Sequence, residues 1–439
     1  MLVVPSKNQI IYQKDELIAF IHFGINTFTD KEWGDGKENP KIFNPKDLDV
    51  NQWIYTLYIS GFKKVIITTK HHDGFCLWPS SFTNHSIKNS PYKNGKGNIV
   101  KEVYDACCKY GLKFGIYLSL WDQNSIYYGK GEAYNKYYIN QLKELLNNYP
   151  SILEIWMDGA KDSKINQDYD FDRYFKVIKK LQPNCIIFSP VGPDIRWIGN
   201  ERGYAGEPFW STIDISKMKI KEIPKYLNTG DPKGTNWVVG EADVSIRPGW
   251  FYHESENSKV KTLNELKDIY FNSVGRNAVL LLNVCPNKEG KLYKVDINNL
   301  KSFSNWINRT FSNNLLKGSS IKSKELDQNH SNLINSNYDD YCSCTTKTPT
   351  IEISFEKELK FNIIQIQEYI PLGQRIFNFK IYCFIENNWQ EVYKGQTIGY
   401  KRLILIDTVK ASKIKIEILD SIEKPILNNV SIYFDKNSK

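Results

Sequence analysis

Short apolar runs alternate with amphipathic stretches from Leu17 to about Asn308. The runs are rich in β-branched residues and apolar at consecutive positions, which predicts strands covered on both faces. These predicted strands are Leu17–Phe23, Lys64–Thr69, Leu112–Ser119, Ile152–Asp158, Cys185–Ser189, Asn236–Glu241 and Ala278–Val284. Strands that alternate with helices predict a parallel sheet, because parallel neighbours need a long crossover connection.

Between the predicted strands, apolar residues recur at helical spacing, as in 99–110, 134–145, 171–181 and 263–270. A closed (β/α)8 TIM-like barrel is the fold that this alternation favours. A doubly wound open sheet is the alternative. It predicts a glycine-rich phosphate-binding turn after the first strand, and the sequence has none there.

The pattern changes after about Phe311. Ser, Asn and Lys dominate residues 312–337, which we interpret as a linker or an irregular entry. Strand-like runs without helices between them follow, at Thr350–Phe355, Phe361–Glu368, Phe377–Ile385, Trp389–Tyr393, Arg402–Ile406, Lys413–Leu419 and Val430–Phe434. They predict an all-β sandwich. We therefore expect a catalytic barrel in 1–311, a linker in 312–337 and a C-terminal sandwich in 338–439.

Composition narrows the classes of function. Aromatic residues make up 14% of the 439 residues, and aromatic rings stack on sugar faces as well as filling cores. The net charge of +9 is spread along the chain without a basic block, so we expect no nucleic-acid partner. No apolar span reaches the length of a membrane helix, so we expect no membrane insertion. Met1–Val4 is too short an apolar start to predict a signal peptide, and the compartment stays open.

The eight cysteines stand at positions 76, 107, 108, 185, 285, 342, 344 and 383. Their spacing matches neither a regular disulfide framework nor a zinc knuckle, and we expect free, mostly buried thiols. His85 and His330 have no context that indicates chemistry, and we expect both at the surface.

Polar residues gather where predicted strands end. His22 closes the first strand, His71 and His72 follow the second, and Asp158 ends the fourth. The C-terminal strand ends of such a barrel carry its active site, so these side chains should share one rim. Adjacent histidines of an extended segment face opposite ways, and a zinc site would need a third ligand such as Asp158 or His22. Hydrogen bonds to ligand hydroxyls suit neutral imidazoles better, and we expect no metal and no cofactor.

A carboxylate at a barrel rim fits a glycosidase, which needs a second carboxyl group. Candidates for the second carboxyl are Glu201, Glu207 and Glu241, and local physics alone leaves the choice open. Glu201 lies in a loop between Gly199 and Gly203, which would let it swing over a bond. Glu207 precedes the stiff Pro208, and Glu241 ends a predicted strand.

Segments from the whole predicted barrel resemble α-L-fucosidases of glycoside hydrolase family 29. They are HFGINTFTDKEWG (22–34), KHHDGFCLWPS (70–80), NSPYKNGKGNIV (89–100), LKFGIYLSLWD (112–122), EIWMDGA (154–160), RWIGNERGYA (196–205) and SIRPGWFYH (245–253). The resemblance implies a barrel followed by a β-sandwich and the hydrolysis of α-L-fucosides. The sandwich resembles discoidin-like carbohydrate-binding modules in 373–381 and 397–406, and we expect it either to bind glycans or only to pack on the barrel.

The resemblance also implies roles. Asp158 becomes the nucleophile, and Glu201 becomes the acid/base, since its Gly-Asn-Glu loop resembles the branch that cleaves α-1,3 and α-1,4 linkages. The implied substrate-binding residues are His22, His71, His72, Trp121, Arg247 and Trp250, and Glu241 is expected to bond the sugar or orient Arg247. Met157 and Arg202 depart from the family pattern near these groups.

Taken together, the sequence predicts a retaining exo-α-L-fucosidase that removes terminal fucose from branched, Lewis-type glycans by double displacement. Its partners would be fucosylated oligosaccharides and glycoconjugates. Another glycosidase on a similar barrel, such as an α-galactosidase, and an inactive glycan-binding protein are the alternatives.

Overall fold

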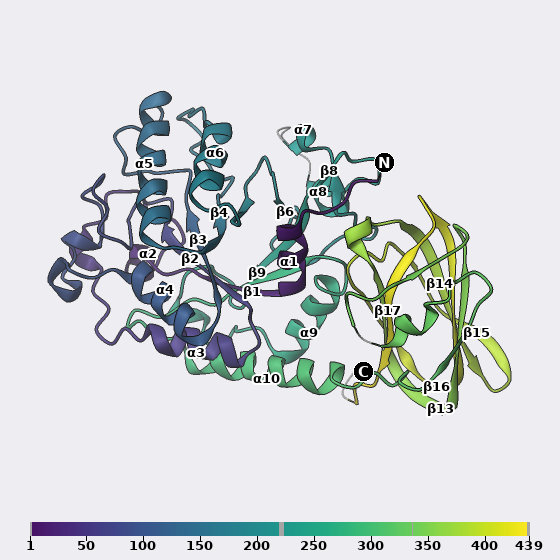
Figure 1. The fold of residues 1–439 in the computed structure, drawn as a ribbon. Coiled ribbons are helices and arrows are strands. Elements are labelled where there is room, and N and C mark those ends of the chain that lie inside the picture. The colour runs from purple at the N-terminus through teal and green to yellow at the C-terminus, as the bar shows by residue number, and fades with distance from the viewer. Residues whose placement is uncertain (1, 219–223, 336, 437–439) are drawn as a thin grey trace.

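The computed structural model describes residues 2–218, 224–335 and 337–436. Its first part is a closed barrel of eight parallel strands, and a separate antiparallel sheet follows toward the C-terminus (Figure 1). The barrel strands are β1 (Leu17–Ile21), β2 (Lys64–Lys70), β3 (Lys113–Leu118), β4 (Ile152–Trp156), β5 (Ile186–Phe188), β6 (Ile195–Trp197), β9 (Val239–Ser245) and β10 (Val279–Asn283). The predicted fold class is confirmed.

Burial on both faces explains the continuous apolar runs. In β1, Ile18 and Phe20 belong to the cluster inside the barrel, whereas Leu17, Ala19 and Ile21 pack in the layer under the helices. Each buried large apolar side chain contributes roughly 1.5–3 kcal/mol. Both sides of the strand therefore hold it in place.

Helices surround the barrel (Figure 1). They are α1 (Lys7–Asp15), α2 (Ile25–Thr29), α3 (Val50–Ile59), α4 (Ile99–Tyr110), α5 (Glu132–Asn148), α6 (Phe171–Leu181), α7 (Ile215–Met218), α8 (Pro224–Thr229), α9 (Leu263–Asn272) and α10 (Lys294–Phe311). Asp49 and Asn98 cap α3 and α4 by accepting bonds from Gln52 N and Lys101 N. None of the described helices combines the length and apolarity that a membrane crossing requires.

The sequence pattern missed β6, the sixth of the eight barrel strands in chain order. It has three residues, Ile195–Trp197, and only a turn joins it to β5. Three residues are too few to show the hydrophobic periodicity of a strand. No helix-like stretch separates them from the preceding strand, so the alternation of strands and helices gives no signal either. The segment that sequence analysis treated as part of a loop therefore completes the barrel.

Two strand ends differ from their predicted positions. The predicted strand Asn236–Glu241 is in fact the short β8 (Asn236–Trp237) followed by β9, so Glu241 lies inside β9 rather than at its end. β4 ends at Trp156, and Asp158 follows in the loop.

His85, expected at the surface, is buried: only 5% of it is exposed, and its ring meets Phe75 edge to face. That expectation was wrong because a loop between β2 and α4 folds back over it. All eight cysteines are free, and Cys108 is the exposed one.

The C-terminal sheet is antiparallel and runs in the order β12-β17-β13-β16-β14-β15, with β11 beside β13. The strands are β11 (Ser320–Lys322), β12 (Cys342–Ser343), β13 (Thr350–Glu368), β14 (Ile376–Ile385), β15 (Asn388–Gln396), β16 (Arg402–Ser421) and β17 (Ile426–Tyr433). Irregular pairing after Ser354 and Phe361 interrupts the long β13, which sequence analysis had divided into two strands. Both halves contribute to one apolar core.

The segment predicted as a linker takes part in this sheet. β11 pairs with β13, and Leu316 and Leu333 are fully buried in the core of the C-terminal sheet. The sequence did not indicate this role, because two buried leucines are too few to form a pattern in a segment rich in polar residues.

The bottom of the barrel is closed by α1 and a buried ion cluster. Lys64 Nζ lies 2.9 Å from Glu154 Oε2 and 3.6 Å from Asp15 Oδ2, and Lys113 Nζ lies 2.5 Å from Asp15 Oδ1. Lys64 and Glu154 are almost entirely inaccessible to water. Removing one charge of such a pair leaves the other uncompensated.

We expect Lys64→Met to destabilise the protein by about 3–5 kcal/mol, because the Glu154 carboxylate would stay buried without its cation. Adding Glu154→Gln should recover part of the loss. Urea denaturation followed by tryptophan fluorescence measures both variants. A double variant less stable than Lys64→Met would contradict the charge argument.

Candidate active site

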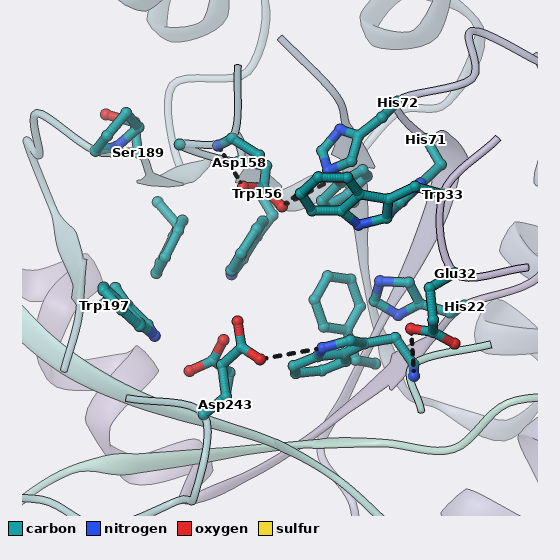
Figure 2. Close-up of a pocket in the computed structure, with 18 of the residues that line it drawn as sticks. His22, Glu32, Trp33, His71, His72, Trp156, Asp158, Ser189, Trp197 and Asp243 are labelled. Carbon is teal, nitrogen blue, oxygen red and sulfur yellow. Dashed lines mark hydrogen bonds and ion pairs between the residues drawn. The ribbon is translucent and has the colours of Figure 1, made fainter. Parts of the chain in front are cut away.

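A cavity of about 630 Å³ opens at the C-terminal end of the barrel strands (Figure 2). Its lining comes from all over the barrel and comprises Phe20, His22, Glu32, Trp33, His71, His72, Tyr117, Trp156, Asp158, Gly159, Ala160, Phe188, Ser189, Pro190, Trp197, Glu201, Met218, Pro224, Leu227, Asp243 and Trp250. The expected rim is therefore present, and it holds more groups than the sequence indicated.

Asp158 is fixed on one side of the cavity. Its Oδ1 accepts a bond from Ala160 N at 2.8 Å, and its Oδ2 accepts one from the Tyr117 hydroxyl at 3.1 Å. His72 Nε2 lies 3.8 Å from the same Oδ2. The side chain keeps 27% of its surface exposed, so a ligand can reach the carboxylate.

His22 is oriented by Asn283. The Asn283 amide nitrogen donates to Ser245 Oγ and to the Trp250 carbonyl, so its oxygen faces His22 Nδ1, 2.8 Å away. His22 therefore carries its proton on Nδ1 and presents Nε2 as an acceptor. Burial lowers the pKa of His22 to about 3, so the ring is neutral in ordinary buffers.

His72 is oriented in the same way. The Ser119 hydroxyl donates to the Trp121 carbonyl at 2.7 Å, so Ser119 Oγ accepts from His72 Nδ1, also at 2.7 Å. Burial lowers the pKa of His72, although the Asp158 charge opposes the shift. Its Nε2 thus becomes an acceptor beside Asp158.

His71 completes the histidine group. Its ring stacks on Tyr117 with centroids 5.6 Å apart, and among the described residues its Nδ1 has no partner. Burial lowers the pKa of His71 well below its usual range, and the neighbouring His72 and His22 lower it further. His71 thus lines the cavity with a neutral ring.

Carboxyl groups also line the side opposite Asp158, where Figure 2 shows Asp243 and Trp197. Glu201 accepts a bond from Trp250 Nε1 at 3.3 Å. Burial raises the pKa of Glu201 against the effect of this bond, and the charges of Asp158 and Glu32 raise it further. Asp243 is buried, which raises its pKa well above the usual range, and the Glu201 charge adds to the shift. This side of the cavity therefore retains protons that an exposed carboxyl would release.

Glu32 and Trp33 line the cavity from the loop after α2. Glu32 accepts bonds from Trp250 N at 2.9 Å and Phe251 N at 3.1 Å, and His253 Nε2 lies 2.7 Å from it. The exposed Trp33 ring meets Trp121 and His72 edge to face. Glu32 thus ties two rim loops together.

Three predicted substrate contacts lie outside the lining. Trp121 sits behind His72, with ring centroids 5.1 Å apart. Arg247 is fully buried, and its guanidinium bonds Asp296 at 3.0 Å and Asn257 at 3.1 Å. Glu241 lies deeper in the barrel, bonded to Tyr12 and to Trp156 Nε1. These residues support the walls of the cavity without reaching its surface.

The family resemblance implied that Arg247 binds substrate. The chain turns after Ser245, and the turn sends the arginine toward α10, where Asp296 neutralises it. Glu241 was expected at a strand end, but it lies two residues below Asp243 on the inward face of β9.

Glu207 lies at the contact with the C-terminal sheet, where Arg402 Nη2 is 2.5 Å from its Oε1. It does not line the cavity, so Glu201 is the member of the three candidate glutamates that does.

The loop that carries Glu201 is braced and does not swing freely. Asn200 Nδ2 donates to Tyr204 O at 2.9 Å, and Asn228 Nδ2 donates to Ile198 O at 2.8 Å and to Tyr204 O at 3.0 Å. A Cβ at Gly199, whose φ is +79°, would come within 2.2 Å of Pro224 O. The flanking glycines provide a tight turn rather than mobility.

Within the described residues, no group of three or more His, Cys, Asp or Glu side chains could hold a metal ion. The ring nitrogens His22 Nδ1 and His72 Nδ1 are already engaged by Asn283 and Ser119.

A family profile described as Alpha-L-fucosidase matches residues 8–311. Alpha-L-fucosidase 1 of Arabidopsis thaliana is 42% identical over 451 aligned positions, which cover 100% of this chain and 89% of the plant protein. The chain belongs to the α-L-fucosidase family, glycoside hydrolase family 29.

Solved structures agree with this family. The crystal structure of SpGH29 superposes with a TM-score of 0.96 at 41% identity and covers 99% of each chain. A Ruminococcus gnavus GH29 fucosidase in complex with fucose gives a TM-score of 0.91 at 38% identity, over 99% of this chain and 95% of that one.

Sequence reasoning missed several residues that line the fucosidase cavity: Glu32, Trp33, Tyr117, Trp197 and Asp243. Asp243 had a signal, because it lies two residues beyond Glu241 and must face the same side of a strand. Glu32 and Trp33 stood inside a quoted motif as an acid next to an aromatic residue. Trp197 had none, since β6 was not recognised.

Ser119→Ala should weaken the binding of L-fucose about fivefold, because loss of one hydrogen bond, about 1 kcal/mol, would free His72 to change tautomer. Titration of tryptophan fluorescence with fucose measures the affinity. Ser125→Ala, outside the cavity, is the control. Unchanged affinity in Ser119→Ala would show that the tautomer is held by something else.

Proposed function

We propose that this α-L-fucosidase is a retaining exo-enzyme in which Asp158 is the nucleophile and Glu201 the acid/base. The observation that carries the proposal is the pair of carboxyls on opposite sides of one cavity, with a raised pKa on the Glu201 side. Retaining enzymes need such a pair about 5–5.5 Å apart around the scissile bond.

In the first step, an Asp158 oxygen bonds to the anomeric carbon while the glycosidic carbon–oxygen bond breaks. Glu201 gives its proton to the departing oxygen. The bonds from Tyr117 and Ala160 hold the nucleophile in place, so little reorganisation precedes attack.

In the second step, a water molecule attacks the anomeric carbon and gives a proton to Glu201, and the ester bond to Asp158 breaks. Two inversions leave the configuration of the sugar unchanged. The raised pKa of Glu201 keeps the acid form populated at a higher pH than an exposed glutamate would.

The sugar would be held by neutral acceptors and aromatic faces. His22 Nε2 and His72 Nε2 accept from fucose hydroxyls, and the indoles of Trp33 and Trp250 offer apolar surface to the ring and its methyl group. Trp121, Arg247 and Glu241 act by supporting His72, the Trp250 turn and Trp156.

For the linkage, we propose α-1,3 and α-1,4 bonds to a branched glycan. The Gly-Asn-Glu loop resembles that branch of the family, and the cavity that Glu201 lines also has the apolar lining residues Pro190, Met218, Pro224 and Leu227. Such a wall suits the apolar faces of leaving-group sugars, and fucosylated oligosaccharides and glycoconjugates would be the partners.

Glu201→Ala should lose about 10²–10⁴-fold in kcat/KM on a fucosylated trisaccharide and far less on an aryl fucoside with a good leaving group, which needs no acid. Asp158→Ala should lose several orders of magnitude on both substrates.

Azide separates the two roles by product. In Glu201→Ala it attacks the fucosyl-enzyme and gives the α-fucosyl azide, whereas in Asp158→Ala it replaces the nucleophile and gives the β-fucosyl azide. NMR of the products distinguishes the anomers, and a β-azide from Glu201→Ala would reverse the assignment.

Lewis-type trisaccharides should be cleaved with a higher kcat/KM than 2′-fucosyllactose or core α-1,6 fucosides. Contacts to the branching galactose would be realised in the transition state, so simple aryl fucosides should also be poor substrates. Fucose release from the panel, followed by chromatography, decides the matter. Preference for 2′-fucosyllactose would exclude the proposed linkage.

A further inference from the structure

We infer that the C-terminal sheet positions the proposed acid/base. The sheet holds the Glu201 loop by its contacts with Glu207 and with the residues that follow Glu207, and we call these contacts the clamp. Glu207 is then a positioning residue, and the second domain serves catalysis without touching the sugar. This inference rests on the proposed role of Glu201.

The loop leaves the barrel at the end of β6, turns at Glu201 and returns toward β7 (Thr212–Ile213). Much of the Glu201 residue faces solvent, but its carboxyl lies in the cavity lining, where Trp250 Nε1 donates to it at 3.3 Å. The place of its carboxyl therefore depends on how firmly the two arms of the loop are held.

Glu207, on the returning arm, is gripped by the C-terminal sheet. Its Oε1 accepts from Arg402 Nη2 at 2.5 Å, from the Tyr393 hydroxyl at 3.2 Å and from Gln396 N at 3.3 Å. Arg402 is buried, with 2% of its surface exposed. Charge-assisted bonds of this kind are strong where water is excluded.

The next residues of the arm are gripped as well. Phe209 N donates to Thr397 Oγ1 at 2.9 Å, and Gln374 bonds both Ser211 N and Phe209 O at 2.9 Å. Thr397 and Gln374 belong to the second domain and are buried. The domain thus replaces the backbone partners that this irregular segment would find in a regular strand.

Residues of the barrel hold the part of the loop between Glu207 and Glu201. Arg276 Nη1 donates to Ala205 O at 3.1 Å, and Arg276 Nη2 lies 3.8 Å from Glu207 Oε2. Ala205 N donates to Asn272 O at 2.8 Å, and Asn200 closes the neck of the loop. Asn200, Ala205, Glu207 and Phe209 are therefore anchored at intervals along the loop.

The nucleophile has no part in this arrangement, since Asp158 follows β4 and bonds Tyr117 and Ala160. A displacement of about 1 Å can reduce catalysis 10²-fold. Loosening the clamp should thus impair proton donation selectively and leave the attack on the sugar intact.

An ordinary domain contact would behave differently, and Glu16 provides the matched control. It also lies on the barrel, and it accepts from Tyr400 and Lys401 of the second domain, far from the Glu201 loop in sequence. Its loss removes a comparable glutamate–tyrosine–cation contact and should affect stability without changing the preference between leaving groups.

The test compares Glu207→Ala, Glu207→Gln and Glu16→Ala in the full chain, with kcat/KM measured on a fucosylated trisaccharide and on an activated aryl fucoside. We expect Glu207→Ala to lose about 10–100-fold on the trisaccharide and less than about twofold on the aryl fucoside. Glu207→Gln should lie between, and Glu16→Ala should keep the wild-type ratio.

Equal losses on both substrates, or no loss, would overturn the clamp. If Glu207→Ala does not fold, Thr397→Val and Thr397→Ser decide: only the valine variant lacks the acceptor for Phe209 N, and only it should lose the trisaccharide selectively. Equal behaviour of these two variants also overturns the clamp. Glu201→Ala is the reference variant. If it loses the same activity on both substrates, the acid/base assignment itself is wrong. If it loses the trisaccharide selectively and Glu207→Ala does not, only the clamp is wrong.

Discussion

Closure of the barrel is the constraint on which the site depends. Eight parallel strands that meet edge to edge must bring their C-terminal ends to one opening, and every second residue there faces the same interior. The cavity brings together groups that lie far apart in sequence: the histidines after β1 and β2, the carboxylate after β4 and the acid on β9. Their positions at the C-terminal strand ends direct them all toward this one opening. Chemistry then follows from which residues occupy those ends.

The surroundings of each titratable side chain in the cavity favour a particular protonation state. Three histidines are kept neutral by burial, and two of them have their tautomers fixed by Asn283 and Ser119. Asp158 stays partly open to water, whereas burial acts on Glu201 and Asp243 to favour the protonated form. Under the proposed mechanism, these different surroundings would suit one carboxyl group to act as nucleophile and another to act as proton donor.

Much of this was legible in the sequence. Consecutive apolar residues revealed seven barrel strands, and the position of Asp158 and His22 after such runs placed them at the rim. The pattern could not show β6, because this strand has three residues and no helix before it. Trp197, which lies in β6, was therefore not predicted to line the cavity. The ion pair of Arg247 with Asp296 could not be predicted either, because the two residues are far apart in sequence and local patterns give no sign of so distant a partner. Leu316 and Leu333 were hidden in a polar stretch because two anchors are too few to form a period.

The contact between Trp156 and Glu241 has a consequence for how such a site can evolve. Trp156 forms part of the cavity wall, stacks on Phe188 with centroids 3.9 Å apart and donates to Glu241, which in turn bonds Tyr12 on the helix that closes the barrel. A smaller residue in place of Trp156 would open room for a larger sugar, but it would also remove the hydrogen bond to Oε1 of a buried carboxyl, which would be left with the bond from Tyr12. Adaptation to bulkier monosaccharides must therefore change the indole and the glutamate together, and single substitutions lead first through a less stable protein.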